Sequence, residues 1–279
     1  MGGAMNHSKN FVIPCLIVML SVWSGAARAA ETLSVSYTSS LDNAPLKALL
    51  QLPGSHDPDA PTPLLVWVQG MYTDAQYGMN YAGAAADRKG WLVMTTDMRG
   101  KRTGGKTNLG AQRAQQDLID ALDQVLDDYN VDRDRIYLAG ISMGGLTGGL
   151  TLENFPDKFA AGALLMGISD LKDWHEEEKS YEPINPDILR ECGGTPQEAP
   201  EEYATRSLFP KAPVLADMPL LICHGRGDTT VYPSHAEKLI ALVLKHRPTD
   251  LYVYWFDGGH AENEIDVDKV FDFIGRFAR

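Results

Sequence analysis

The chain has 279 residues, 44% of them apolar and 22% charged, with 37 acidic residues against 25 lysines and arginines. This composition is typical of a globular protein, and the length suits an α/β domain that buries a sizeable core without disulfides or metals. The net charge of −12 repels phosphate backbones, which argues against nucleic acid as a partner.

The first thirty residues have the features of a secretory signal. Lys9 precedes a short apolar run at 11–23, and residues 27–29 read Ala-Arg-Ala, the small-residue exit that a signal peptidase requires. The apolar run is too short to span a bilayer. Removal of residues 1–29 takes away two basic residues and no acidic one, so the net charge falls from −12 to −14. We predict a signal peptide over 1–29 and a secreted or periplasmic mature chain without a membrane span, forming one domain over 30–279.

Short apolar strands alternate with helical patterns along the mature chain. The continuous apolar run at 64–68 is typical of a strand covered on both faces. The predicted strands cover residues 33–37, 46–52, 64–68, 91–95, 136–139, 161–166, 219–223 and 251–256.

The helical segments show apolar residues at a spacing of three and four. Leu118, Leu122 and Val125 share one face of a predicted helix. Ser234, with Glu237 three residues later, predicts a capping box. The predicted helices cover residues 110–129, 144–154, 234–245 and 267–278. This alternation predicts the α/β class, with a mostly parallel sheet of about eight strands and helices on both faces.

Residues 170–213 interrupt this alternation. The segment is rich in Glu, Pro, Trp and Tyr and has no strong strand pattern. Because a segment that long inside a compact domain is usually functional, we interpret it as a cap inserted over the sheet edge. It is called the cap segment below. Cys192 and Cys223 could pair in an oxidising compartment, but Cys223 falls in a predicted central strand, which favours buried free thiols.

Residues 140–144 match the pattern G-x-S-x-G, with Ser142 at its centre. Acyl transfer needs a serine held exposed on a tight strand-to-helix turn, and the glycines let the strand and helix approach. The match directly follows a predicted strand and leads into a predicted helix. A purely structural serine in a glycine-rich turn is the alternative.

A serine nucleophile needs a histidine base and a carboxylate that orients the histidine. Asp228 follows the predicted strand at 219–223, and His260 follows the strand at 251–256. The order Ser142, Asp228, His260 is the order that this mechanism takes in α/β hydrolases. Asp257 is the alternative acid, and His224 is expected to pack at the end of its strand.

The oxyanion of the tetrahedral intermediate requires two N–H donors. We assign Met143, which follows the nucleophile, and Met71, which lies in the loop after the strand at 64–68. The side chains of Gln69 and Tyr72 could contribute to this site or line the substrate pocket.

From about residue 62 to its end, the chain resembles the catalytic domain of the prolyl oligopeptidase family and its single-domain esterase relatives, members of the α/β-hydrolase superfamily. The matching segments are 97–100, the helix beginning near 117, 140–145, 159–162, 169–170, 192–196, 201–203, 224–228 and 259–260. The resemblance implies the same catalytic triad of Ser142, Asp228 and His260, and a role for Arg99 in holding the turn below the site.

Two departures from the family pattern bear on the substrate. Family peptidases select peptides with an upstream propeller or other domain, and only about thirty mature residues precede the first core strand here. Gln69 precedes Gly70 in the predicted oxyanion loop, at a position where the family often has His or Tyr. The chain is in these respects similar to acetyl, feruloyl and related carbohydrate-ester hydrolases. Trp174 and Tyr181 in the cap segment, with Tyr72 and Tyr77 opposite, are expected to stack on an aromatic acyl or sugar ring, or else to be packed or exposed loop aromatics.

The leading hypothesis is therefore a carboxylic ester hydrolase acting on a small-molecule or oligosaccharide ester, with no cofactor. No metal is predicted, because the acidic cluster at 174–178 lacks zinc-ligand spacing. The alternatives are a peptidase for short peptides and a non-catalytic binding protein of the same fold. A carboxylate facing the pocket from the cap segment, such as Asp170, Asp173 or Glu176, would favour the peptidase. The oligomeric state does not follow from the sequence.

Overall fold

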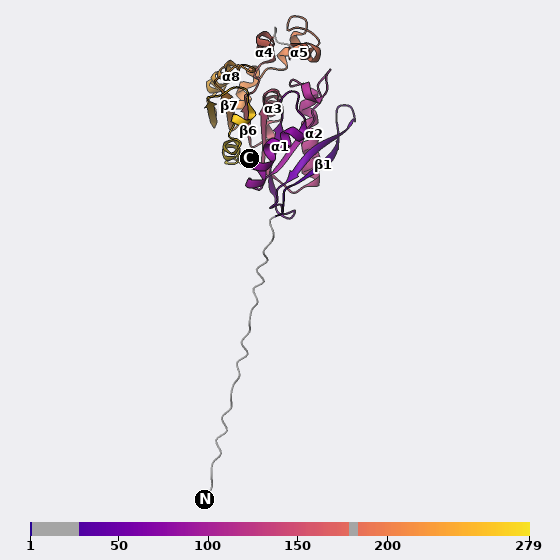
Figure 1. Ribbon diagram of the computed structural model, residues 1–279, viewed down its shortest axis with the longest axis vertical. Helices are drawn as coiled ribbons and strands as arrows, with labels where there is room; N and C mark the ends of the chain where they lie inside the picture. Colours follow the sequence, from indigo (N-terminus) through magenta and orange to yellow (C-terminus); the bar gives the residue numbers. More distant parts are fainter. Residues whose placement is uncertain (2–27, 179–183) are drawn as a thin grey trace.

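The computed structural model of the chain describes residue 1 and residues 28–178 and 184–279 (Figure 1). The signal peptide predicted over residues 1–29 lies almost wholly outside the described residues. Among the described residues, no helix is both long enough and apolar enough to cross a bilayer.

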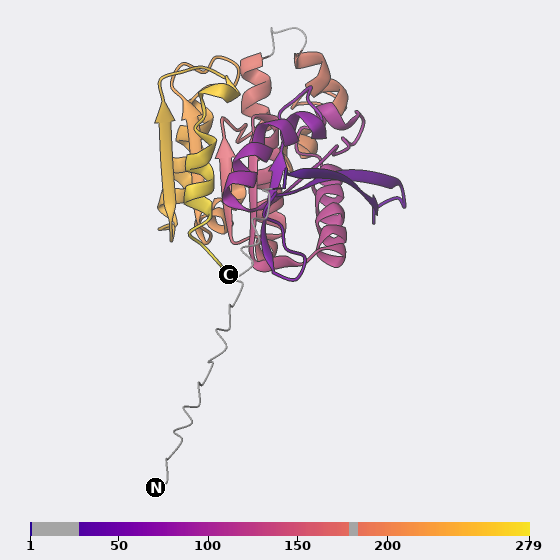
Figure 2. The ribbon, with the colours of Figure 1, turned by 60° about the horizontal axis from the view of Figure 1, so that its bottom comes forward.

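An eight-stranded sheet forms the centre of the molecule, with strand order β1-β2-β4-β3-β5-β6-β7-β8. β1 and β2 form an antiparallel hairpin at one edge, and the strands from β4 to β8 pair in parallel. Figure 2 shows the hairpin in indigo at one edge and β7 and β8 in orange and yellow at the other. The strands are β1 (Glu31–Thr38), β2 (Pro45–Leu52), β3 (Thr62–Val68), β4 (Leu92–Thr96), β5 (Val131–Ile141), β6 (Ala161–Leu165), β7 (Leu220–Gly225) and β8 (Leu251–Phe256). The predicted α/β class and mostly parallel sheet are confirmed.

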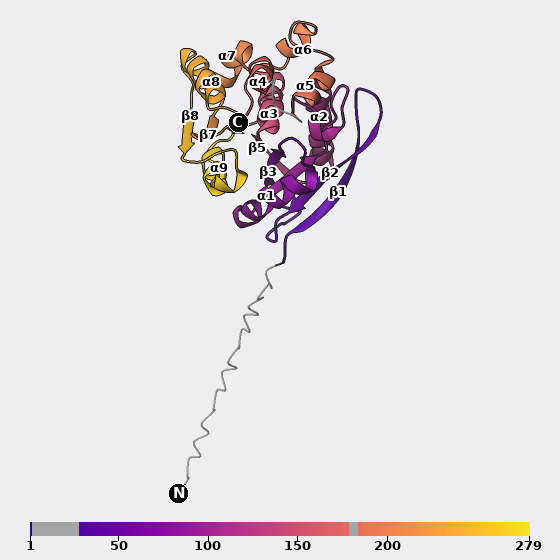
Figure 3. The same ribbon diagram turned by 45° about the horizontal axis from the view of Figure 1, so that its top comes forward.

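Helices cover both faces of the sheet, as Figure 3 shows for α2, α3 and α8 above it and α1 and α9 below. Successive residues of a strand point alternately into two hydrophobic cores, one on each face of the sheet. Leu64 and Val66 of β3 pack in the core that includes α2, α3 and α8, whereas Leu65 and Trp67 pack in the core that includes α1 and α9. These helices are α1 (Ala75–Lys89), α2 (Gln112–Asp128), α3 (Met143–Asn154), α8 (Ser234–Lys245) and α9 (Val267–Ile274).

The helix α1 is not among the predicted elements. Its buried face consists mainly of alanine and glycine, so it shows no strong apolar periodicity. The small residues serve close packing, because a Cβ on Gly78 would lie 2.9 Å from Cδ1 of Trp67. The sequence signal for this helix is Asp74, whose side chain caps the helix by accepting from the Tyr77 N–H.

The capping box predicted at the start of α8 does not form. Pro233 is the N-cap residue, and no side chain caps the helix. Ser234 Oγ instead lies 3.3 Å from Glu177 Oε1 in the cap segment. The prediction is wrong because Ser234 is already inside the first helical turn, where its hydroxyl is free to bond elsewhere.

The described part of the cap segment is mostly helical. It contains α4 (Leu171–Glu178), α5 (Ile184–Cys192), α6 (Pro200–Ala204) and the 3₁₀ turn η3 (Phe209–Lys211), and it leads directly into α7 (Ala212–Ala216). Figure 1 places α4 and α5 together at one end of the molecule. Cys192 in α5 and Cys223 in β7 are both buried free thiols, which the sequence pattern favours.

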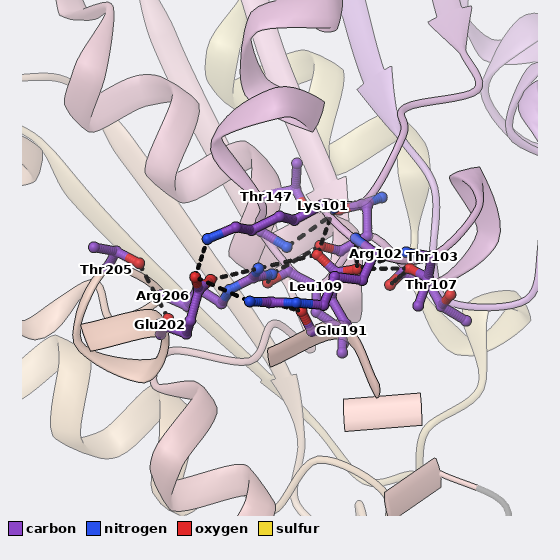
Figure 4. A network of polar contacts seen from close by, with 12 residues as sticks. Lys101, Arg102, Thr103, Thr107, Leu109, Thr147, Glu191, Glu202, Thr205 and Arg206 are labelled. Carbon is purple, nitrogen blue, oxygen red and sulfur yellow. Dashed lines mark hydrogen bonds and ion pairs between the residues drawn. The ribbon is translucent and has the colours of Figure 1, made fainter. Parts of the chain in front are cut away.

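A buried carboxylate ties the cap segment to the loop after β4 (Figure 4). Glu191 accepts hydrogen bonds from the backbone N–H groups of Lys101, Arg102 and Thr103 at 2.6–2.9 Å. It also pairs with Arg206 at 3.0 Å, where both side chains are almost fully buried. The loop and the cap segment are therefore held together by charge-assisted hydrogen bonds.

The same network reaches the helix that follows Ser142. Arg206 Nη1 donates to the backbone oxygens of Asn108 and Leu109, and Thr147 Oγ1 of α3 lies 2.7 Å from Asn108 Oδ1 (Figure 4). The cap segment, the loop after β4 and α3 therefore form one connected unit.

Glu153 of α3 gives a pH-dependent prediction for stability. Its side chain is buried, and neither carboxyl oxygen has a hydrogen-bond partner among the described residues. Burial raises the pKa of Glu153 to about 9, against a smaller opposing effect of Lys211. The group is therefore protonated in the folded chain and ionised in the unfolded chain between about pH 4.5 and 9, so it lowers stability progressively across that range.

We expect Glu153→Gln to be about 2–4 kcal/mol more stable than the wild type at pH 8, with a much smaller difference at pH 4. Urea denaturation at the two pH values measures this. Glu237→Gln, at an exposed position of α8, is the control and should show no such gain. An equal effect of Glu153→Gln at both pH values would contradict the assigned ionisation.

Candidate active site

Ser142 occupies the turn between β5 and α3, with φ 58° and ψ −122°. A non-glycine residue rarely adopts this conformation, and the surrounding turn holds it in place. The Ser142 N–H donates to the Leu165 oxygen of β6 at 2.9 Å. A Cβ on Gly140 would lie 2.1 Å from the Gly144 oxygen, and one on Gly144 would lie 2.1 Å from the Val68 oxygen. Glycine at both positions therefore lets strand and helix meet closely enough to form the turn.

The structure brings Ser142, Asp228 and His260 together. His260 Nε2 lies 2.9 Å from Ser142 Oγ, and His260 Nδ1 lies 2.7 Å from Asp228 Oδ2. Each residue follows the carboxyl end of a parallel strand, namely β5, β7 and β8, so the sheet delivers all three to one edge. This arrangement can move a proton from a hydroxyl to an imidazole that is oriented by a carboxylate.

Asp228 is held ionised by its surroundings. Its side chain is fully buried, and Oδ1 accepts from the N–H groups of Thr230 and Val231 at 2.9 Å each. Burial alone raises the pKa of this carboxyl, but hydrogen bonds from His224 and His260 outweigh burial and hold the pKa well below its usual range. A carboxylate in that state keeps the Nδ1 proton of His260 in place.

The two competing residues have other partners. His224 is buried at the end of β7, with Nε2 2.8 Å from the Val231 oxygen and 3.3 Å from Asp228 Oδ2. It therefore supports Asp228 and does not contact Ser142. Asp257 has a 97% exposed side chain, 3.7 Å from Arg226, so it does not orient His260.

The two predicted oxyanion donors belong to segments on either side of Ser142. Met143 is the first residue of α3, so its N–H has no acceptor within the helix. Met71 follows Gly70, and a Cβ on Gly70 would lie 3.5 Å from Cβ of Ser142. No backbone hydrogen bond of the described residues uses the N–H of Met71 or Met143 as donor.

Tyr72 fixes the loop that carries Met71. It adopts a left-handed conformation with φ 65°, and its N–H donates to the Lys106 oxygen at 2.8 Å. Its hydroxyl donates to Asp187 Oδ2 of α5 at 2.7 Å. The loop is thereby connected to the loop after β4 and to the cap segment.

Gln69 and Trp174, two of the predicted substrate-binding residues, are buried, and their contact with substrate stays a prediction. Gln69 is 2% exposed, and its Nε2 donates to the Thr96 oxygen at 3.0 Å. Trp174 is also 2% exposed, and its Nε1 donates to the Thr230 oxygen at 2.8 Å. The N–H groups of both side chains thus donate to backbone oxygens, whereas Gln69 Oε1 is buried without a hydrogen-bond partner among the described residues.

The remaining aromatic residues have different outcomes. Tyr181 lies outside the described residues. Tyr72 and Tyr77 are 44% and 47% exposed, respectively, and their predicted contact with substrate stays a prediction.

Arg99 holds the turn after β4, as the resemblance implies. Its guanidinium makes two hydrogen bonds of 2.8 Å with the buried Asp117 of α2 and one of 2.8 Å with Asp42 in the β1–β2 turn. The bond to Arg99 lowers the pKa of Asp42 to about 2.

Glu262 is a neighbour of Ser142 that no motif indicates. It lies two residues after His260, in the 3₁₀ turn η4 (Glu262–Glu264). A Cβ on Gly70 would lie 3.7 Å from Glu262 Oε1. Its position depends on the path of the chain after β8, which the sequence pattern does not indicate.

The groove described below does not include the three residues of the proposed triad, and no metal site accompanies them among the described residues. A groove of about 840 Å³ runs between α2 and α6, and Ser142, Asp228 and His260 do not line it. Within residues 28–178 and 184–279, no group of three or more His, Cys, Asp or Glu side chains is arranged to hold a metal ion.

Comparison with known proteins finds relatives that are named as peptidases. The uncharacterized peptidase YtmA of Bacillus subtilis is 30% identical over 170 residues, which are 60% of this chain and 63% of that protein. Dipeptidyl aminopeptidase BIII of Pseudoxanthomonas mexicana is 29% identical over 251 residues, which are 84% of this chain and 36% of that protein. The chain thus spans less than two thirds of the length of these relatives.

Solved structures share the fold at low identity. A putative dipeptidyl aminopeptidase IV from Bacteroides ovatus superposes with a TM-score of 0.73 at 22% identity, over 91% of this chain and 37% of that one. The acylaminoacyl peptidase of Pyrococcus horikoshii superposes with a TM-score of 0.71 at 18% identity, over 90% of this chain and 42% of that one. Residues 81–278 match the model of the prolyl oligopeptidase family. The chain belongs to the prolyl oligopeptidase family and has an α/β-hydrolase fold.

Proposed function

We propose that this protein is a serine peptidase that cleaves short peptides through an acyl-enzyme on Ser142. The observation that carries the proposal is the contact of 2.9 Å between Ser142 Oγ and His260 Nε2 in a member of a peptidase family. The two curated relatives described above are named as peptidases. The ester hydrolase favoured by the sequence alone lacks comparable support and becomes an outcome of the test.

The proposed reaction begins with proton transfer to His260. As Ser142 Oγ attacks the scissile carbonyl carbon, His260 Nε2 takes its proton, and the ionised Asp228 stabilises the imidazolium through Nδ1. The N–H groups of Met71 and Met143 bind the oxyanion of the tetrahedral intermediate.

His260 then acts as an acid. It gives the proton to the leaving amine as the C–N bond breaks, which leaves the acyl group on Ser142. A water molecule attacks the ester carbon with His260 again as base, and Ser142 is regenerated when the acid product leaves. The net reaction adds one water across one amide bond.

The cap segment supports a short substrate. Its helix α5 contacts the proposed oxyanion loop through the hydrogen bond from Tyr72 to Asp187. We infer from this contact that the cap segment narrows access to the oxyanion loop, which favours a small or extended chain over a folded protein. Export, with removal of residues 1–29, stays a prediction.

A substrate panel tests the proposal. We expect hydrolysis of aminoacyl and dipeptidyl p-nitroanilides, and also of short-acyl p-nitrophenyl esters, because an activated ester acylates the same serine. Ser142→Ala, purified in parallel, corrects for contaminating activity. Efficient release of acid from acetylated xylan or methyl ferulate, with no cleavage of any p-nitroanilide or short peptide, would overturn the peptidase in favour of the esterase.

A further inference from the structure

Glu262 and Ser142, the proposed nucleophile, both lie within 4 Å of the same point in the site. The position that a Cβ on Gly70 would take is 3.5 Å from Ser142 Cβ and 3.7 Å from Glu262 Oε1. Gly70 precedes Met71, the proposed oxyanion donor. The carboxylate is therefore beside the place where the scissile carbonyl of a substrate has to bind.

The helix α1 holds Glu262 in this position. Tyr81 donates a hydrogen bond from its hydroxyl to the Glu262 backbone oxygen. Tyr77, one turn earlier, hydrogen-bonds to the Glu262 side chain. The backbone and the carboxylate are thus both anchored by neutral tyrosine hydroxyls.

No cation of the described residues forms an ion pair with Glu262. Its side chain is half-buried, and burial raises the pKa of this carboxyl, against smaller opposing effects of Tyr77 and His260. Partial desolvation of a carboxylate without a cationic partner costs free energy. A positively charged group on a bound ligand would offset this cost.

Two of the three cap-segment acids expected to take such a role, Asp170 and Asp173, have other partners. Asp173 pairs with Lys238 of α8 at 2.6 Å. Asp170 Oδ1 accepts from the Asp173 N–H at 2.8 Å, so it caps its own helix. Glu262, by contrast, lies near the position beside Gly70 that Ser142 also approaches.

We propose that Glu262 binds the free α-amino group of the substrate and selects peptides whose ammonium lies close to the scissile carbonyl. This inference rests on the proposed function and names its substrate class. An ammonium beside Glu262 would donate charge-assisted hydrogen bonds to the carboxylate, whereas an N-acylated amine would carry no charge and would leave the carboxylate unpaired.

The test compares matched substrates that differ only in the amine. Alanyl and alanyl-alanyl p-nitroanilides are assayed beside their N-acetylated forms. The wild type should prefer a free-amine form, and Glu262→Gln should lower its kcat/KM for that form about 10- to 100-fold, mainly through KM. The N-acetylated forms should change less than about threefold, since they make no charged contact with Glu262.

Asp257→Asn is the matched control, because it removes one negative charge from an exposed position three residues before His260. It should leave the ratio of free-amine to N-acetyl activity unchanged. Thermal unfolding of both variants checks that they are folded. A preference of the wild type for the N-acetylated forms, or an equal loss on both forms in Glu262→Gln, would overturn the proposal.

Ester substrates distinguish a failure of the amine-site proposal from a failure of the peptidase proposal. The p-nitrophenyl esters of alanine and N-acetylalanine acylate Ser142 even if the enzyme cannot break an amide bond. A free-amine preference on esters that is lost in Glu262→Gln supports the amine site even when no p-nitroanilide is cleaved, and in that case only the peptidase proposal fails. If the wild type shows no preference between the two esters, the amine site is overturned.

Discussion

Ser142→Ala is expected to lower kcat about 10⁶-fold on the best substrate, with little change in KM. The hydroxyl is the proposed nucleophile, and no other side chain can take its place in the acyl-enzyme. His260→Ala should cost nearly as much, because Ser142 then has no base within hydrogen-bond distance. The double variant should lose no more than either single variant, since the two groups act in one step.

Steady-state kinetics on the three variants measures these losses in kcat. The non-additivity of the two substitutions is the more discriminating result. Thermal unfolding checks that each variant folds. If the effects of the two substitutions multiplied, Ser142 and His260 would act independently, in conflict with a proton transfer across 2.9 Å.

Asp228→Asn is expected to lower kcat about 10⁴-fold while KM changes little. An amide carries no charge to stabilise the imidazolium. Its NH₂ group can also donate to Nδ1 and so favour the wrong tautomer of His260, with the proton on Nε2. Asp257→Asn is the control, and it should retain activity because its side chain is almost fully exposed.

Asp228 also accepts two backbone hydrogen bonds, so the stability of the variant must be measured beside its activity. A folded Asp228→Asn protein with near-normal kcat would show that this carboxylate does not orient the base. A large loss in Asp257→Asn would point to the competing acid.

The fold and the three residues of the proposed triad could be predicted because each leaves a pattern in a short stretch of sequence. The strands at 64–68 and 219–223 are continuous apolar runs, which buried parallel strands require. Ser142 lies in the pattern G-x-S-x-G, whose glycines are required by the close approach of strand and helix. Asp228 and His260 each follow a predicted strand. Since parallel strands end at one edge, sequence order alone indicates that these residues converge.

The burial of two side chains could not be predicted, because it depends on the tertiary structure. Trp174 and Gln69 were placed in the right segments, but their exposure depends on which helix face and loop side turn inward. The side-chain N–H groups of both donate to backbone oxygens of segments distant in sequence, at Thr230 and Thr96. Neither contact leaves a local pattern.

Two further features lack a strong signal for a different reason. The helix α1 packs through small residues, so its buried face is not apolar in the usual sense. Glu262 comes next to Ser142 through the turn after His260 and through tyrosines of α1, which lie about 180 residues earlier in the chain. An acid in a short turn near the C-terminus resembles any solvent-exposed acid.

The most direct test of the account is the reaction of the folded protein with a fluorophosphonate, followed by mass spectrometry of the labelled peptide. The proposed triad predicts a single adduct on Ser142 that forms quickly in the wild type and is lost or greatly slowed in His260→Ala. A folded wild-type protein that stays unlabelled, or that carries its adduct on a different serine, would contradict it.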